Sequence, residues 1–268
     1  MRRTAALATG LLVLSLASGC DSDEAPAAFT TASALADAAI AGTAQGRTAS
    51  FTTDVSSGTL KSKGSGQIRF DGENTALSLV TDFIGEPLEL RLADKTLFVK
   101  VPESSRGEIG DGKPWVRVSP DGTDPFSQVL GGSLDQLARQ NDAERTLGQV
   151  KKAGKLTKAE QGDLTGTTAE HYWLDIDLEK LGTELPAGLS TDAINQLRGK
   201  VGHFPLELWL NKNNEPLQIT LNLSPILTAA GAPDGASAKI TTNYKNWGTP
   251  VDVNPPPPNQ IGTLPTPN

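Results

Sequence analysis

Few residues in this chain are of the types that perform covalent or metal chemistry. Its 268 residues include one cysteine, Cys20, and two histidines, His171 and His203. A lone thiol can serve as a nucleophile, a metal ligand or a site of modification. It cannot form a disulfide within its own chain, so the residues around it must decide among these roles.

The sequence contains no familiar catalytic or metal-binding motif. There is no G-x-S-x-G or S-x-x-K segment, and neither histidine lies in H-E-x-x-H or another metal-ligand spacing. We expect His171 and His203 to occupy edge or turn positions. The segment "GEIGDGKP" (107–114) resembles a phosphate-binding loop, but Pro114 replaces the hydroxyl that would hold Mg²⁺, and a strand-like segment follows. We interpret it as a turn.

Two carboxylates and four tryptophans are the remaining candidates. Asp175 and Asp177 share one face of a predicted strand, and we expect that face to be solvated rather than to bind Ca²⁺. The tryptophans are Trp115, Trp173, Trp209 and Trp247. We expect them to anchor the core or the sheet edges, although Trp173 and Trp209 fall on the parity opposite to the neighbouring leucines. The sequence therefore predicts no catalytic residue, no metal site and no cofactor.

The first twenty residues have the layout of a bacterial lipoprotein signal. Arg2 and Arg3 precede an apolar run from Ala5 to Ser18, which is too short to span a bilayer. The run ends in "LASGC", which resembles a lipobox. That resemblance implies that Cys20 receives a diacylglyceryl group and becomes the new N-terminus. Two acyl chains anchor a protein stably, so we expect it on the extracytoplasmic face of the cell membrane.

The charge of the chain excludes one class of partner. The formal net charge is −7, and removal of residues 1–19 with their two arginines makes it −9. No cluster of Lys and Arg stands out, so a nucleic-acid partner is not expected. Membrane attachment would come from the lipid anchor rather than from a basic patch.

Composition divides the chain into four parts. They are a signal peptide (1–19), a lipidated N-terminus with an acidic tether (20–29), one domain (30–253) and a Pro-rich tail (254–268). Pro255 to Pro258 must be extended and cannot join the centre of a sheet. We interpret the tail as a disordered terminus rather than a recognition motif.

The spacing of apolar residues predicts the secondary structure of the domain. Hydroxyl residues followed by alanines, Leu35 and Ile40 predict a helix over residues 30–45, closed by Gly46. Alternation of apolar and polar residues then predicts antiparallel strands with one buried face. The alternating segments are "TALSLVTDF", "EPLELRLAD", "HYWLDIDLEKL", "FPLELWLNK" and "PLQITLNLS". A helical spacing returns between Pro125 and Arg145 and between Leu189 and Arg198.

These elements predict the fold class. Short segments such as "FDGEN", "LADKT" and "NKNNEP" favour tight reversals between the strands. We expect an α+β fold in which a few helices cover one apolar face of a large antiparallel sheet. The helices are few for a sheet of about ten strands, and this leads to the hypothesis that a ligand supplies the remaining cover.

Four further segments, together with the lipobox, resemble the actinobacterial LppX/LprA/LprF/LprG lipoprotein family in the LolA/LolB-like fold group. They are "GKPWVRV" (112–118), "GTTAEHYWLDID" (166–177), "FPLELWL" (204–210) and "NYKNWGTPVDVNPP" (243–256). The resemblance implies a half-open β-barrel whose helices close its concave side over an apolar cavity. It also implies that acylated lipids or glycolipids bind there and move through the envelope, with an export or loading protein as a partner.

The inward-facing apolar residues of the strands would line such a cavity. A lipid carrier needs apolar volume and few unpaired polar groups, which are costly to bury. The predicted lipid contacts are Leu77, Leu79, Phe83, Leu88, Leu90, Leu174, Ile176, Leu206, Leu208, Ile219 and Leu221.

Three functions are compatible with the sequence to different degrees. The first is a membrane-anchored lipid carrier. The alternative is a non-enzymatic structural or signalling envelope lipoprotein whose core is fully packed and which binds a protein partner. An enzyme is the least supported, because the catalytic motifs are missing.

Overall fold

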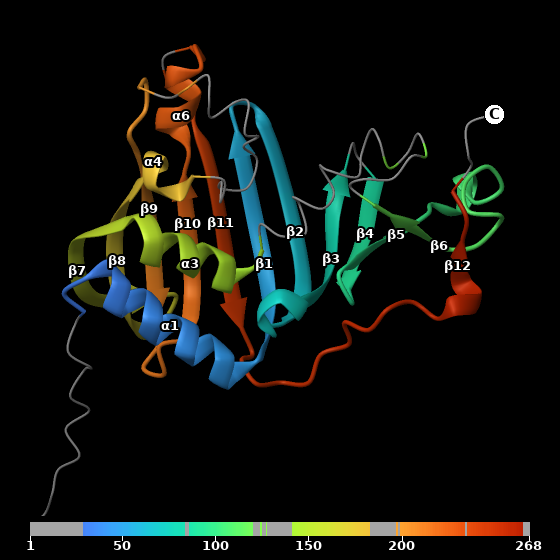
Figure 1. The fold of residues 1–268 in the computed structure, drawn as a ribbon, viewed down its shortest axis with the longest axis horizontal. Coiled ribbons are helices and arrows are strands. Elements are labelled where there is room, and N and C mark those ends of the chain that lie inside the picture. The colour runs from blue at the N-terminus through green and yellow to red at the C-terminus, as the bar shows by residue number, and fades with distance from the viewer. Residues whose placement is uncertain are drawn as a thin grey trace, which may run out of the picture.

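One large sheet dominates the structure, and helices lie across one face of it (Figure 1). The structure is a computed structural model that describes residues 29–83, 86–119, 141–182, 199–233 and 235–264, with the single residues 124, 127 and 197. We call the face that carries the helices the inner face and the opposite one the outer face.

Twelve strands and several short helices make up the described part of the chain. The strands are β1 (Thr48–Ser57), β2 (Leu60–Arg69), β3 (Ala76–Phe83), β4 (Glu86–Ala93), β5 (Thr96–Lys100), β6 (Trp115–Val118), β7 (Gly154–Leu164), β8 (Thr167–Asp177), β9 (His203–Leu210), β10 (Pro216–Asn222), β11 (Ala238–Lys245) and β12 (Ile261–Gly262). The α-helices are α1 (Ala32–Gly46), α3 (Ala143–Ala153), α4 (Leu178–Leu181) and α6 (Ser224–Ala229). Single 3-10 turns are η1 (Gly72–Asn74), η2 (Glu103–Ser105) and η4 (Pro258–Gln260).

The strands form one open sheet in the order β12-β6-β5-β4-β3-β2-β1-β11-β10-β9-β8-β7. Neighbouring strands are antiparallel except for β12, which is parallel to β6. The two edge strands, β12 and β7, do not pair with each other, so the sheet remains open. This confirms the predicted fold class, an α+β fold with a large antiparallel, half-open sheet and few helices.

The five alternating segments form strands with the predicted parity. In β9, Phe204, Leu206, Leu208 and Leu210 are buried, whereas the residues between them are exposed or half-buried. Cross-strand pairing continues this face, because Leu208 lies opposite Ile219 of β10. Buried residues of separate strands thus join into one apolar core.

Helices α1 and α3 pack against each other and against β7, β8 and β10 (Figure 1). The predicted first helix is confirmed as α1. The hydroxyl of Thr31 caps its start by accepting from the amide of Ala34, and it ends at Gly46 as predicted. Asp142 caps α3 in the same way, through the amides of Glu144 and Arg145.

Several elements went unrecognised in the sequence or lie outside the described residues. Only the first three residues of α3 fall within the predicted helical spacing, and the rest of this helix, in which four of eleven residues are charged, was not predicted. The helical segments predicted between Pro125 and Arg145 and between Leu189 and Arg198 lie outside the described residues, apart from Ser127, residues 141–145 and Leu197. "GEIGDGKP" does form turns before β6, as predicted.

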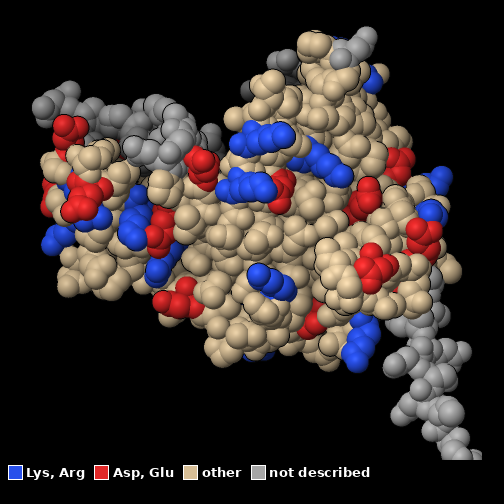
Figure 2. Space-filling model, turned by 180° about the vertical axis from the view of Figure 1, so that it is seen from behind, with Lys and Arg blue, Asp and Glu red and all other residues tan. Residues whose placement is uncertain are grey.

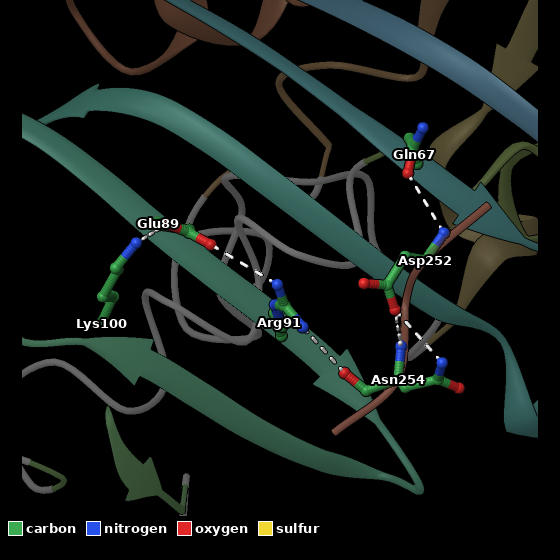
Figure 3. Close-up of polar contacts among 6 residues, drawn as sticks. All are labelled: Gln67, Glu89, Arg91, Lys100, Asp252 and Asn254. Carbon is green, nitrogen blue, oxygen red and sulfur yellow. Dashed lines mark hydrogen bonds and ion pairs between the residues drawn. The ribbon is translucent and has the colours of Figure 1, made fainter. Parts of the chain in front are cut away.

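The C-terminal residues 249–264, which we call the strap, lie against the outer face of the sheet. The amide of Asp252 donates to Oε1 of Gln67 at 3.3 Å, and Nη1 of Arg91 donates to the carbonyl of Asn254 at 3.2 Å (Figure 3). Arg91 also approaches Glu89, which forms an ion pair with Lys100 at 2.6 Å. Residues from β2 and β4 therefore hold the strap, and Lys100 of β5 is linked to Arg91 only through Glu89.

The strap ends as the edge strand β12. Val253 is fully buried against Ala76 and Ala93, and Ile261 pairs with Trp115 of β6. Interpreting the tail as a disordered terminus is therefore wrong for residues 254–264. The prediction from sequence did not recognise that apolar residues after the prolines, Ile261 and Leu264, dock on the sheet.

Two glycines in β2 let the neighbouring strands approach closely. Gly64 and Gly66 occupy inward positions, between Thr53 and Thr81 and between Phe51 and Leu79. A Cβ added at Gly66 would collide with the carbonyl oxygen of Ser78 and lie 2.7 Å from the Phe51 ring. The sheet tolerates no side chain at this position.

We predict that Gly66→Ala lowers the free energy of unfolding by about 2 kcal/mol or more, because the backbone carbonyl cannot move aside. Chemical denaturation of the two proteins measures the change. The matched control is Gly148→Ala in α3, where nothing lies within 4 Å of the added Cβ. That variant should gain about 0.5–1 kcal/mol from the greater helix propensity of alanine. An unchanged midpoint for Gly66→Ala would contradict the account of the sheet.

Candidate functional site

The inner face of the sheet is built from rows of apolar residues that run across the strands. In one row Leu79 lies between Gly66 and Leu90, and Val99 continues it on β5. In another row Leu206 lies between Leu174 and Leu221. Strand parity sends all of these side chains to one side, so the rows together form a continuous apolar surface.

The structure brings the predicted lipid-contact residues together on this face. All of those whose side chains are described belong to the same core or pack against it. Those that are 0–4% exposed are Leu77, Leu79, Leu90, Leu174, Ile176, Leu206, Leu208, Ile219 and Leu221. Leu88 is half-buried, and Phe83 lies in β3 with its side chain outside the described part. Their contact with a lipid remains a prediction.

One row of the inner face is polar, and the sequence analysis did not identify it. Thr242, Thr53, Gly64 and Thr81 follow one another across β11, β1, β2 and β3. The hydroxyls of Thr53 and Thr242 lie 3.4 Å apart, and that of Thr81 donates to the carbonyl of Lys63 at 3.0 Å. Because the hydroxyls are paired within the sheet, this row leaves the face compatible with apolar contact.

Tyr244 ties the inner face to α3 from within the core. Its hydroxyl donates to the carbonyl of Asn141, just before the helix, at 3.0 Å. Burial raises the pKa of Tyr244 well above its usual value, with the nearby Asp142 carboxylate adding to the effect. Burial raises the pKa of Tyr172 in the same way. Both phenols therefore stay neutral and add no charge to the apolar face.

Two hollows in the described part of the chain have mixed polar and apolar linings. One, of about 580 Å³, lies on the outer face among Asp54, Lys63, Ser65, Val80 and Asp82. The other, of about 640 Å³, lies at the opposite end of the strands, where β9 turns into β10. Neither is lined by the inward leucines. Those leucines are covered by the protein itself as it stands.

The outer face carries an aromatic cluster on β8 and β9. The ring of His171 is stacked on Trp209, with centroids 3.9 Å apart, and lies 3.5 Å from the centroid of Trp173. Nε2 of His171 is 3.1 Å from Oε2 of Glu207, where the ring N–H donates to the carboxylate. The expectation that His171 occupies an edge or turn was wrong. It lies within β8, two residues from Trp173 and on the same face.

The remaining predicted positions agree with the outer face being polar. Asp175 and Asp177 are half-buried there, and Asp177 caps α4 by accepting from the amide of Glu179. His203 begins β9, with Nδ1 3.5 Å from Oδ2 of Asp175. Within the described residues no group of three His, Cys, Asp or Glu side chains could hold a metal ion.

Cys20 and the rest of the predicted signal and tether lie outside the described residues, except for Phe29. Phe29 packs 6.0 Å from the ring of Tyr172 on β8, so the predicted tether leads to this side of the domain. No helix among the described residues has both the length and the apolar character needed to cross a membrane.

No protein-family model and no curated protein matches this chain. Several solved structures do. The lipoprotein LppX of Mycobacterium tuberculosis is 13% identical over 83% of this chain and 98% of its own, with a TM-score of 0.49. LprF from Mycobacterium bovis is 15% identical over 84% and 96%, with a TM-score of 0.46. A chain of the MucA/MucB complex of Pseudomonas aeruginosa is 14% identical over 82% of this chain and 59% of its own, with a TM-score of 0.36. At these identities and TM-scores we transfer no property from these proteins to this chain.

The His171 cluster predicts how stability depends on pH. Burial lowers the pKa of His171 below its usual 6.5, against the opposing effect of Glu207. The unfolded chain therefore takes up the proton first, so the free energy of unfolding falls as pH drops through 6.5. We predict that His171→Gln, which keeps a hydrogen-bonding group but does not titrate, loses less stability between pH 7.5 and 5.5 than the natural protein.

Denaturation at both pH values measures this difference. The matched control is Gln218→Asn, at a half-buried residue of the same face that does not titrate, and it should keep the natural pH dependence. An identical loss of stability in His171→Gln and the natural protein would contradict the prediction.

Proposed function

We propose that the protein is a membrane-anchored envelope lipoprotein that binds acylated lipids or glycolipids against the inner face and carries or presents them. The observation that supports this most is the continuous apolar inner face, whose one polar row is paired within the sheet. Aliphatic side chains dominate that face, and they suit acyl chains because flexible chains need apolar volume more than stacking partners.

The proposed mechanism is shielding of the acyl chain from water. Each buried CH₂ group is worth about 0.8 kcal/mol, so a long acyl chain gains several kcal/mol in gross terms. The inward leucines are already buried, with Leu79 and Leu208 at 0% exposure. Loading must therefore displace whatever packs against them, and the net gain is smaller than the gross one. A partner that loads or unloads the carrier would lower the barrier to that exchange.

The proposed location follows from Cys20. Acylation there would hold the domain on the extracytoplasmic face of the cell membrane, with residues 21–28 as the tether. Eight residues span at most about 29 Å when extended. The domain would then remain close to the bilayer from which a lipid is taken or to which it is given.

The burial of nearly all of the inward leucines favours one alternative function. If the inner face is a finished core, the protein would be a structural or signalling envelope lipoprotein that binds a protein partner. The two functions differ in whether a lipid ever displaces the protein groups that pack against the inner face.

Native mass spectrometry of the acylated protein, purified from its own membrane, separates the two functions. Organic extraction of the sample then identifies what is released. The proposal predicts a bound mass in addition to the covalent anchor and the recovery of about one lipid per chain. A single unliganded mass that does not change after incubation with added lipids would contradict it.

We predict that Leu208→Gln reduces this lipid occupancy several-fold, because an amide in the centre of the inner face has no partner for its hydrogen bonds. The matched control is Val80→Gln, since Val80 is 45% exposed on the outer face. It should load as the natural protein does. Thermal denaturation accompanies each measurement, and a folded Leu208→Gln protein with full occupancy would exclude the inner face as the site.

A further inference from the structure

Two neighbouring segments at one end of the sheet carry no charge among their described residues. At this end the tip of the β1–β2 hairpin, residues 55–60, lies beside the segment that leads from β10 through α6 into β11. The amide of Gly58 donates to the carbonyl of Ser237 at 2.8 Å, which joins the two segments. No described residue of the hairpin tip or of 223–238 carries a charge, and Asp234 lies outside the described residues. We call this region the hairpin end.

The most exposed large apolar side chain of the described residues is at the hairpin end. Leu60 is 66% exposed, whereas leucines elsewhere in the sheet are buried or half-buried. It follows Gly58, which has a positive φ of 58°, so the turn carries Leu60 at the very tip of the hairpin. Leu227 of α6 is half-buried at the same end.

Lysines border this uncharged region on the outer face, where Asp54 and Asp82 also lie. Lys61 and Lys239 both lie opposite Ser56, one on each side of β1. Both are exposed, and neither has an ion-pair partner among the described residues. Lys63 is next to them and pairs with Asp54 at 3.2 Å. Figure 2 shows basic side chains, with an acidic one among them, gathered on this face.

We propose that the hairpin end docks on a bilayer surface that contains anionic lipids. The chain as a whole carries a charge of −7, so two exposed lysines without a described ion-pair partner, one on each side of β1 at one end, depart from its average character. Basic side chains attract anionic headgroups, while an exposed leucine at a turn can enter the interface between headgroups and acyl chains. The lysines therefore complement anionic headgroups, and Leu60 adds an apolar contact with the bilayer.

Docking at this end would also orient the inner face. The apolar row of Leu206, Leu221, Ile240 and Val55 lies next to the hairpin end. A bilayer in contact with the hairpin end would therefore lie close to one end of the apolar inner face. This last step rests on the proposed function, whereas bilayer docking itself does not require a lipid cargo.

The test uses the full chain carrying Cys20→Ser, which cannot be acylated and has no other thiol. Adding Leu60→Cys allows an environment-sensitive dye to be attached at the hairpin tip only. The matched control is the same dye at Lys212→Cys, in the turn at the opposite end of the sheet. We expect vesicles of 70% phosphatidylcholine and 30% phosphatidylglycerol to shift the emission of the dye at position 60 to shorter wavelength, and not that at position 212.

A second measurement tests the contribution of the two lysines to vesicle binding separately from that of Leu60. Cosedimentation with the same vesicles should fall at least threefold in the Lys61→Gln/Lys239→Gln variant, and it should fall in the natural sequence as NaCl is raised. Lys212→Gln/Lys245→Gln removes the same charge at the other end and should bind as before. Circular dichroism confirms that each variant is folded.

Several outcomes would overturn the proposal. One is a dye at position 60 that does not respond to anionic vesicles, and another is an equal response at position 212. A dye that responds to polyglutamate but not to vesicles would assign the hairpin end to an acidic protein partner instead. If native mass spectrometry finds no bound lipid but the protein docks on vesicles as expected, only the proposed function is contradicted. Failure of the proposed function and failure of the docking proposal are therefore distinguishable.

Discussion

Burial of one apolar face of a single wide sheet is the constraint on which this structure depends. Alternation along each strand sends leucine, isoleucine, valine and phenylalanine side chains to the same side, and antiparallel pairing joins them into rows. Apolar surface left in water costs about 25 cal/mol per Å². Helices α1 and α3 pack over β7, β8 and β10, while the fully buried leucines of β3 and β4 extend the same core far beyond those strands.

The outer face is organised so that it can remain in water. Its side chains pair with one another, as in the hydrogen bond from Gln218 to Asn243 at 2.7 Å and the contact of Thr220 with Thr241 at 3.3 Å. The strap adds a covalently attached layer across β2–β6 and ends by pairing with the β6 edge. The outer face and one sheet edge are held by these contacts, and the inner face is where we propose that a ligand makes apolar contact.

The sequence predicted the part of this fold that carries a strong hydropathy signal. Strands β3, β4, β8, β9 and β10 were recognised because leucines occupy their inward positions. Strands β1, β2, β7 and β11 were not named, because their inward positions include Thr53, Gly64, Ala159 and Thr242, whose small or polar side chains give no contrast. His171 was misplaced although its distance of two residues from Trp173 puts it on the outer face. The docking of the strap depends on contacts with residues almost two hundred positions away, which no local pattern shows.

The measurement that tests the central claim most directly is photocrosslinking with a fatty acid that carries a diazirine at the end of its acyl chain. Peptide mass spectrometry then locates the labelled residues. The account predicts labelling at inward positions of β3, β4, β9 and β10, such as Leu79, Leu90, Leu208 and Ile219, and loss of the label when unmodified fatty acid competes. Labelling confined to outer-face residues such as Val80 and Trp209, or a label that unmodified fatty acid does not displace, would contradict it.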